Sequence, residues 1–325
     1  MKKIVYNDYK RELPLNPIPN NLPDPKISFS YPEDYSYLCS IFGSEEKLED
    51  AFLKHYSTVL KELNHPDTVN NYILTYYIDY DKQVYLVGDL HGNYKRFKEE
   101  LLEKDYRDCV FIMLGDQVML YDDSWKQYRK LDNLFRERNC IAYFIRGNHD
   151  CPYFHTQEYF ALHFTNIFPM NMGTISYRGF SGFVFGGAIS LNRMLMEENK
   201  NFWARYDYID PWRNLYRNWK FDFIIGHTGP IPEGIIFNSG CEKFLSMDKD
   251  LKGDLEKEQN DLTDMLCHMT PKHWFMGHYH KNKEYTLRPF EKKDYECQCH
   301  MIDVNCVLDF SYYFPLDFSF YFPKM

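Results

Sequence analysis

Residues 84–92 run Val-Tyr-Leu-Val-Gly-Asp-Leu-His-Gly, so four apolar or aromatic residues are followed by a glycine, an aspartate and a histidine. A short apolar stretch that ends at a glycine returns five times further along the chain. With the glycine and the one residue after it, these stretches are residues 111–116, 142–148, 183–187, 223–227 and 274–278. Near-continuous apolar runs are typical of strands buried on both faces, and helical patterns lie between them. The sequence therefore predicts a layered α/β fold.

Polar side chains directly after these strands form a candidate metal site. They are Asp89, His91, Asp116, Asn148, His149, Asp150, His227, His278 and His280. The carboxyl edge of an α/β sheet is where such proteins bind their ligands, so we expect these side chains to converge. One Gly-Asp or Gly-His after a strand is ordinary in a turn, but five of the 12 histidines fall in these motifs. Carboxylate, imidazole and amide oxygen together suit Mn²⁺, Fe²⁺, Zn²⁺ or Ni²⁺.

The order of these motifs resembles that of the calcineurin-like metallophosphoesterase superfamily. The motifs that carry the resemblance are Asp89-x-His91, Gly115-Asp116, Gly147-Asn148-His149-Asp150, Gly226-His227 and Gly277-His278-Tyr279-His280. The resemblance covers roughly residues 84–308. It implies a four-layer α/β/β/α sandwich that holds two divalent metal ions at one sheet edge.

The resemblance also implies a role for each residue of the motifs. One ion would be held by Asp89, His91, Asp116 and His280, and the other by Asp116, Asn148, His227 and His278. Asp116 would then bridge the two ions, which are expected to be Mn²⁺, with Fe, Zn or Ni as alternatives. Hydroxide on the metals would attack phosphorus in line, and His149 would protonate the leaving group. Asp150 would orient His149, or would instead cap a helix.

One motif departs from the superfamily's phosphoprotein phosphatases, which carry Gly-Asp-x-Val-Asp-Arg-Gly. Residues 115–121 run Gly-Asp-Gln-Val-Met-Leu-Tyr, so the arginine that clamps the phosphoryl group is missing and bacterial and phage-type members are more similar. We therefore predict an enzyme that hydrolyses phosphodiesters or phosphomonoesters, with nucleotide-like substrates preferred. A protein phosphatase, a nuclease and a catalytically silent scaffold are the alternatives. Candidate substrate contacts are Asn148, Arg146 and Arg193, although Arg146 could form a salt bridge under the loop instead.

Composition limits the partners and the compartment. Lys and Arg number 38 against 47 Asp and Glu, a net charge of −9, which makes nucleic acid an unfavourable main ligand. No stretch approaches the ~20 apolar residues of a membrane helix, and the nine cysteines show no disulfide spacing, so we expect a cytoplasmic protein without a membrane partner. Cys297, Cys299, His300 and Cys306 could bind zinc, but buried thiols are favoured because the usual Cys-x₂₋₄-Cys pair is absent.

The flanks divide the chain into three parts. Residues 1–82 are expected to form an N-terminal extension, with a proline-rich arm followed by a helix over residues 44–64. Residues 83–309 form the metallophosphoesterase domain. Residues 310–325 form an aromatic tail, which must pack on the domain or on a partner subunit and so allows a homo-oligomer.

Two further segments carry expectations. Residues 185–220 are rich in aromatic residues and arginine. They predict either a cap that stacks a base or, as the favoured alternative, helices that pack on the sheet. The charged run at residues 248–264 predicts a helix with a solvated face.

Overall fold

The computed structural model describes most of the region that carries the motifs. The described residues are 75–79, 81–117, 124–150, 155, 160, 164–170, 172–196, 219–232, 242–289, 292 and 294–315. The expected N-terminal arm and its helix over residues 44–64 lie outside them. So do most of the aromatic segment 185–220 and the tail beyond residue 315.

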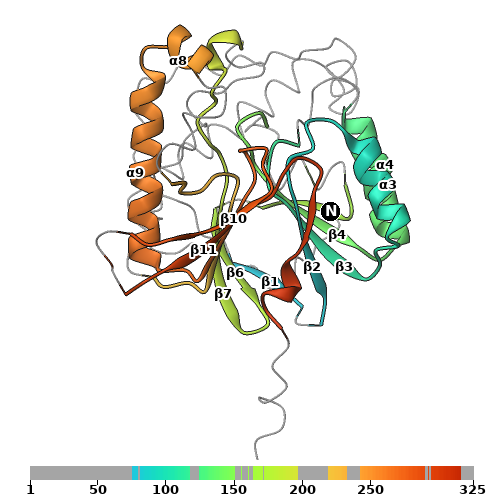
Figure 1. Cartoon of the computed structure of the whole chain (residues 1–325). Coiled ribbons are helices and arrows are strands. Elements are labelled where there is room, and N and C mark those ends of the chain that lie inside the picture. The colour runs from blue at the N-terminus through green and yellow to red at the C-terminus, as the bar shows by residue number, and fades with distance from the viewer. Residues whose placement is uncertain are drawn as a thin grey trace, which may run out of the picture.

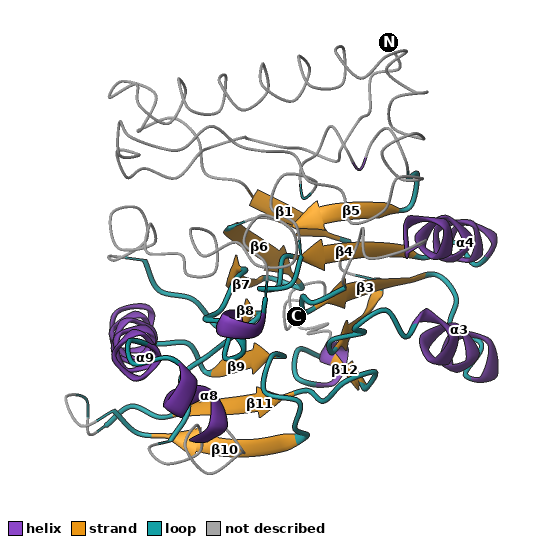
Figure 2. Ribbon diagram, turned by 90° about the horizontal axis from the view of Figure 1, so that it is seen from above, coloured by secondary structure: helices purple, strands orange, loops and turns teal. Residues whose placement is uncertain are grey.

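Two β-sheets face each other at the centre of the molecule (Figures 1 and 2). The seven-stranded sheet has the order β1 (Thr75–Ile78), β6 (Gly173–Tyr177), β7 (Phe180–Phe185), β8 (Phe223–Gly226), β9 (His273–Met276), β11 (Cys297–Met301) and β10 (Lys283–Leu287). The five-stranded sheet has the order β12 (Val307–Asp309), β2 (Gln83–Val87), β3 (Cys109–Met113), β4 (Ile141–Ile145) and β5 (Ile167–Met170). Strands β2 to β5 pair in parallel, as do β7, β8, β9 and β11. Each run of parallel strands therefore places its carboxyl ends at one edge of its sheet.

Helices cover the outer face of each sheet. Helices α3 (Tyr94–Glu103) and α4 (Ser124–Glu137) lie on the five-stranded sheet, and α9 (Leu251–Met269) lies on the seven-stranded sheet (Figure 2). The short helix α8 (Glu242–Met247) precedes α9, and two 3₁₀ turns are η1 (Arg193–Leu195) and η2 (Phe310–Tyr312). The layers are therefore α/β/β/α, which confirms the predicted sandwich.

None of the helices in the described part of the chain combines the length and the hydropathy of a membrane span.

Strand β3 shows why these sequences are apolar throughout. Val110 and Ile112 belong to the core between the two sheets, whereas Phe111 and Met113 belong to the core under α3 and α4. Alternate side chains of a strand point to opposite faces, and both faces are covered here. No position of the strand can therefore be polar without leaving a buried group to satisfy.

The first residues of the aromatic tail pack on their own domain. Phe310 and Phe314 are buried in the core between the sheets. Ser311 Oγ accepts a hydrogen bond from Val84 N (2.7 Å) and lies 2.8 Å from the hydroxyl of Tyr177. Residues 310–314 therefore tie the start of β2 to the end of β6.

The charged run at residues 248–264 is less solvated than we expected, so that prediction is wrong in part. Asp248, Glu258 and Asp261 are buried. Glu258 accepts a hydrogen bond from the backbone N–H of Ile189 (2.9 Å), and Asp248 pairs with Arg193. Asp248 and Glu258 have partners in the segment after β7, which carries Ile189 and Arg193, whereas Asp261 pairs with Lys257 of α9 itself.

The cysteine-rich stretch does not gather into a zinc site. Cys297 and Cys299 point toward α9 and belong to the core beneath it. His300 lies on the opposite face of β11, where its ring stacks on Phe275 with 4.6 Å between centroids. Within the described ranges, no group of potential metal ligands includes these residues. Buried thiols are the interpretation that fits.

The contrast between two neighbouring aromatic residues tests this packing. Phe314 is 2% exposed and Tyr312 is 79% exposed. We expect Phe314→Ala to lower the free energy of unfolding by about 3 kcal/mol, because it empties a filled core site. The matched control Tyr312→Ala should change it by less than about 0.5 kcal/mol. Urea titration measures both, and equal effects would contradict the packing of this segment on its own domain.

Candidate metal centre

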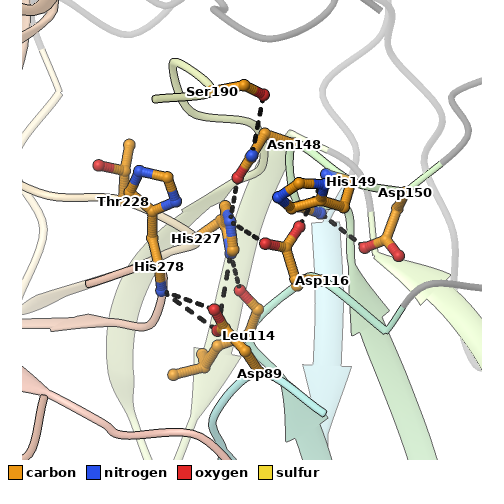
Figure 3. Close-up of polar contacts among 12 residues, drawn as sticks. Asp89, Leu114, Asp116, Asn148, His149, Asp150, Ser190, His227, Thr228 and His278 are labelled. Atoms are coloured by element: carbon orange, nitrogen blue, oxygen red, sulfur yellow. Dashed lines mark hydrogen bonds and ion pairs between the residues drawn. The ribbon is translucent and has the colours of Figure 1, made fainter. Parts of the chain in front are cut away.

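All nine residues of the candidate metal site follow strands at the carboxyl edges of the two sheets. Asp89 and His91 follow β2, Asp116 follows β3, and Asn148, His149 and Asp150 follow β4. From the other sheet, His227 follows β8, and His278 and His280 follow β9. Figure 3 shows the side chains of Asp89, Asp116, Asn148 and His227 directed toward one another from these strands. The two sheets thus meet at this point through polar groups.

The first candidate ligand group joins Asp89, His91 and His280. Their ligand atoms all lie within 4.8 Å of one another. Asp89 Oδ2 lies 3.3 Å from His280 Nε2 and 3.7 Å from His91 Nε2, and the two imidazole nitrogens are 2.8 Å apart. Asp89 is buried, whereas the two histidines reach the surface.

The second candidate group joins Asp116, His227 and His278, again within 4.8 Å. Asp116 Oδ2 is 3.5 Å from His227 Nε2, which also lies 2.9 Å from Asn148 Oδ1. The same Asp116 oxygen is 3.8 Å from His91 Nε2 in the first group. Asp116 therefore lies between the two groups, while its other oxygen, Oδ1, accepts a hydrogen bond from His149 N (2.8 Å).

The donor atoms fit divalent cations. Two ligands that are each about 2.1 Å from one ion lie roughly 3.0–3.4 Å apart, close to the observed separations of 2.8–3.8 Å. His227 Nδ1 donates to Leu114 O (2.7 Å), which leaves Nε2 as the nitrogen facing the carboxylate. Ligand histidines in metal sites are oriented by this kind of bond.

The backbone at the site is strained. His91, Asp116, His278 and His280 have φ angles of 45°, 52°, 65° and 50°, in the left-handed region that residues with a β-carbon rarely adopt. Hydrogen bonds hold these turns: His91 N donates to Asp116 O (3.0 Å), and His278 N donates to the Asp89 carboxylate (3.1 and 3.2 Å). Strain of this kind clusters at functional sites, where the surrounding structure maintains it.

Two motif glycines are required by close approach. A β-carbon on Gly147 would overlap the carboxylate and backbone nitrogen of Asp116, and one on Gly277 would overlap the carboxylate of Asp89. Both carboxylates are almost fully buried. The glycines therefore allow the backbone after β4 and β9 to come close to the two carboxylates.

The charges of the site are strongly coupled. Burial opposes ionisation of Asp89, but hydrogen bonds with His280 and His91 outweigh it and lower its pKa to about 2. Burial also disfavours the charged form of His227, yet Asp116 and Asp89 raise its pKa to about 9. His278 differs: burial, helped by the charge of His227, lowers its pKa to about 3. The buried carboxylates thus demand a compensating positive charge, which divalent cations can supply.

His149 and Asp150 belong to neither candidate ligand group. The His149 ring centroid lies 5.6 Å from that of His91, outside both ligand groups. Asp150 Oδ2 accepts a hydrogen bond from Gly147 N (2.8 Å), so it holds the loop that carries Asn148 and His149.

The two candidate arginines make contacts of their own. Arg146 Nη1 donates to Gly147 O (3.2 Å). Arg193 pairs with Asp248 (2.5 Å) and Asp254 (2.7 Å). Both guanidinium groups therefore have partners within the protein.

Four supporting residues were missed by sequence reasoning. Ser190 Oγ accepts a hydrogen bond from Asn148 Nδ2 (2.9 Å). Tyr279 OH lies 2.9 Å from Thr228 Oγ1 and donates to Gly229 O (2.9 Å), and Gln259 Nε2 of α9 donates to it (3.2 Å). The hydroxyl of Tyr279 thus joins the loop of His227 to the loop of His278 and His280. The only sequence signal was the place of Tyr279 between two histidines.

This junction makes a testable prediction. We expect Tyr279→Phe to weaken Mn²⁺ binding about tenfold, because the two ligand-bearing loops lose their shared hydroxyl. Tyr295→Phe is the matched control, since it also removes a half-buried hydroxyl bonded to a carbonyl, Pro271 O (2.6 Å), outside both candidate ligand groups. Isothermal titration calorimetry measures both affinities. Equal affinities for Tyr279→Phe and the unchanged protein would contradict the positioning role.

Known proteins were compared with this chain. A model of the calcineurin-like phosphoesterase family matches residues 82–282. The crystal structure of TT1561 from Thermus thermophilus aligns with a TM-score of 0.42 and 12% identity, over 70% of this chain and 94% of that one. A second solved structure aligns with a TM-score of 0.41 and 15% identity, over 71% and 96% of the two chains. No curated protein matches the sequence.

The family match covers the part of the chain that carries the site. It covers more than half of the 325 residues and includes every residue of the two candidate ligand groups. The chain belongs to the calcineurin-like phosphoesterase family.

Proposed function

We propose that this chain is a metal-dependent phosphoesterase that hydrolyses phosphodiester or phosphomonoester bonds, with nucleotide-like substrates preferred. The observation that carries the proposal is the position of Asp116 between two groups of nitrogen and oxygen donors. Membership of the family supports the reaction class. The proposed ligands of one ion are Asp89, His91, Asp116 and His280, and those of the other are Asp116, Asn148, His227 and His278.

The donor set supports two first-row divalent cations, with Mn²⁺ preferred and Fe, Zn or Ni as alternatives. When bound, such a pair supplies charge neutralisation for a phosphoryl group and acidifies a water molecule so that hydroxide is present at neutral pH. The protein's part is to fix the ligands. Leu114 O orients His227, and Ser190 orients the Asn148 amide so that its oxygen faces His227.

His149 is the proposed general acid. Its backbone N–H is bonded to Asp116 Oδ1, so its place relative to the ligand groups is fixed. Its ring lies beside His91 and outside both groups, which leaves a ring nitrogen available to protonate the departing oxygen. Asp150 contributes by holding the loop through Gly147 N.

The arginines favour diesters over monoesters. Arg193 is paired with two carboxylates, and Arg146 is buried and bonded to a backbone carbonyl. A phosphomonoester dianion gains more from a free guanidinium clamp than a singly charged diester does. Both of these arginines are bonded to protein partners, so the site favours a diester, which depends less on a guanidinium clamp. The net charge of −9 disfavours long nucleic acids as substrates.

Hydrolysis of two model substrates tests the proposal. We expect bis-p-nitrophenyl phosphate to be hydrolysed faster than p-nitrophenyl phosphate when Mn²⁺, Ni²⁺ or Zn²⁺ is added. Asp116→Asn should lower this activity by about 100-fold or more and reduce the bound ions from two per chain, because the shared carboxylate charge is lost. Release of p-nitrophenol and metal analysis measure the two effects. No hydrolysis of either substrate with any metal would favour the silent scaffold.

A second prediction separates the acid from the ligands. His149→Ala should keep both ions but lower kcat by about 10²–10⁴ on substrates with poor leaving groups, because they need a proton donor. Substrates with p-nitrophenol as the leaving group should lose less. The matched control is His268→Ala near the end of α9, outside both candidate ligand groups, which should leave kcat and metal content unchanged. Loss of metal in His149→Ala would contradict the assignment.

A further inference from the structure

Two cysteines face each other at the end of the five-stranded sheet opposite the ligands. Cys109 is the first residue of β3, and Cys140 immediately precedes β4. The parallel register pairs Val110 with Ile141, so the two cysteines are opposite one another one position earlier. Both side chains belong to the core under α3 and α4.

The two sulfur atoms are in direct contact. Cys109 Sγ and Cys140 Sγ lie 3.4 Å apart, and both residues are buried. A disulfide has an S–S distance of about 2.05 Å, so each sulfur needs to move by roughly 0.7 Å to form one. Neighbouring parallel strands lie about 4.8 Å apart, within the range that a disulfide can span.

The surroundings make one thiol more reactive than the other. The hydrogen bond with Cys109 lowers the pKa of Cys140 to about 7, and the charge of Arg138 acts in the same direction. The pKa of Cys109 is raised by the same thiol contact and by burial. Arg138 is held in place by Asp105 (2.9 Å) and Tyr106 O (3.1 Å). Because Arg138 lies two residues before Cys140 and its charge favours a thiolate there, Cys140 is the expected nucleophile of the pair and Cys109 the expected resolving thiol.

We propose that Cys109 and Cys140 form a reversible intramolecular disulfide on exposure to a low-molecular-weight disulfide such as oxidised glutathione. The Cys140 thiolate attacks one sulfur of the glutathione disulfide, which forms a mixed disulfide and releases one glutathione thiolate. Cys109 then loses its proton and attacks the Cys140 sulfur, which forms the protein disulfide and releases the second glutathione. Two protein thiols are oxidised while one glutathione disulfide is reduced to two thiols.

Access to the buried pair runs through two short loops. Asp108 and Asn139, which directly precede the two cysteines, are exposed and are hydrogen-bonded to each other (2.5 Å). Asp108 N also donates to Arg138 O (3.0 Å). Local opening of these bonds is the route by which the oxidant reaches the sulfurs, because strand ends open at low cost.

The disulfide has two expected consequences. It closes the segment between residues 109 and 140, so it restricts the unfolded chain and should raise Tm by about 5 °C. Its effect on metal binding should be small, since the pair lies at the strand starts and the ligands follow the strand ends. This inference therefore stands apart from the proposed function.

Thiol mapping of the full chain tests the proposal. The folded protein is incubated with oxidised glutathione, unfolded with alkylating reagent present, and digested without reductant for mass spectrometry. We expect a linked peptide pair containing Cys109 and Cys140, which dithiothreitol separates. Cys267, buried on α9, serves as the in-chain control and should be alkylated.

Two further results decide the outcome. In Cys109→Ser the resolving thiol is lost, so Cys140 should accumulate as a mixed disulfide with glutathione. Recovery of both cysteines of the unchanged protein as alkylated thiols, while it stays folded, would overturn the proposal. Linkage of either cysteine to a different cysteine would overturn it as well.

Discussion

The buried carboxylate of Asp116 is the group on which the rest of the site depends. It leaves β3, one of the inner strands of its sheet, in a left-handed conformation, and both of its oxygens are engaged. One oxygen accepts the backbone N–H of His149, and the other faces His227 and His91 from opposite ligand groups. A buried anion in this position is stable only with positive charge around it. Burial disfavours a charged His227, yet Asp116 and Asp89 raise its pKa to about 9.

The two packed sheets hold the buried carboxylates close together and keep the turns that carry them in strained conformations. The core between the two sheets fixes the strand ends from which the candidate ligands project. Motif glycines let the backbone of β4 and β9 come close to the acidic residues, and bonds from His278 and His91 keep the strained turns in place. The aromatic residues Phe310 and Phe314 complete this core. Packing, backbone strain and charge therefore all act on the carboxylates of Asp89 and Asp116.

Strong local patterns predicted a layered α/β fold and the convergence of the candidate ligands, whereas the four-layer order was implied by the resemblance to the calcineurin-like superfamily. Apolar runs that end in Gly-Asp or Gly-His specify buried parallel strands and the edge where their polar residues meet. The partners of Arg193 could not be predicted, because Asp248 and Asp254 come more than 50 residues later and meet it only when α9 packs on the sheet. The same packing buries Glu258, which a charge pattern alone indicates as solvated. The role of the Tyr279 hydroxyl could not be predicted either, because its partners Thr228 and Gly229 lie on another loop.

The central claim is that Asp116 lies between two cations. Anomalous diffraction from crystals of the protein soaked in Mn²⁺ tests it most directly. The account predicts two anomalous peaks about 3.5 Å apart, one beside Asp89 and His280 and one beside His227 and His278, with Asp116 Oδ2 bound to both. A single peak that Asp116 does not touch, or two peaks outside these groups, would contradict it.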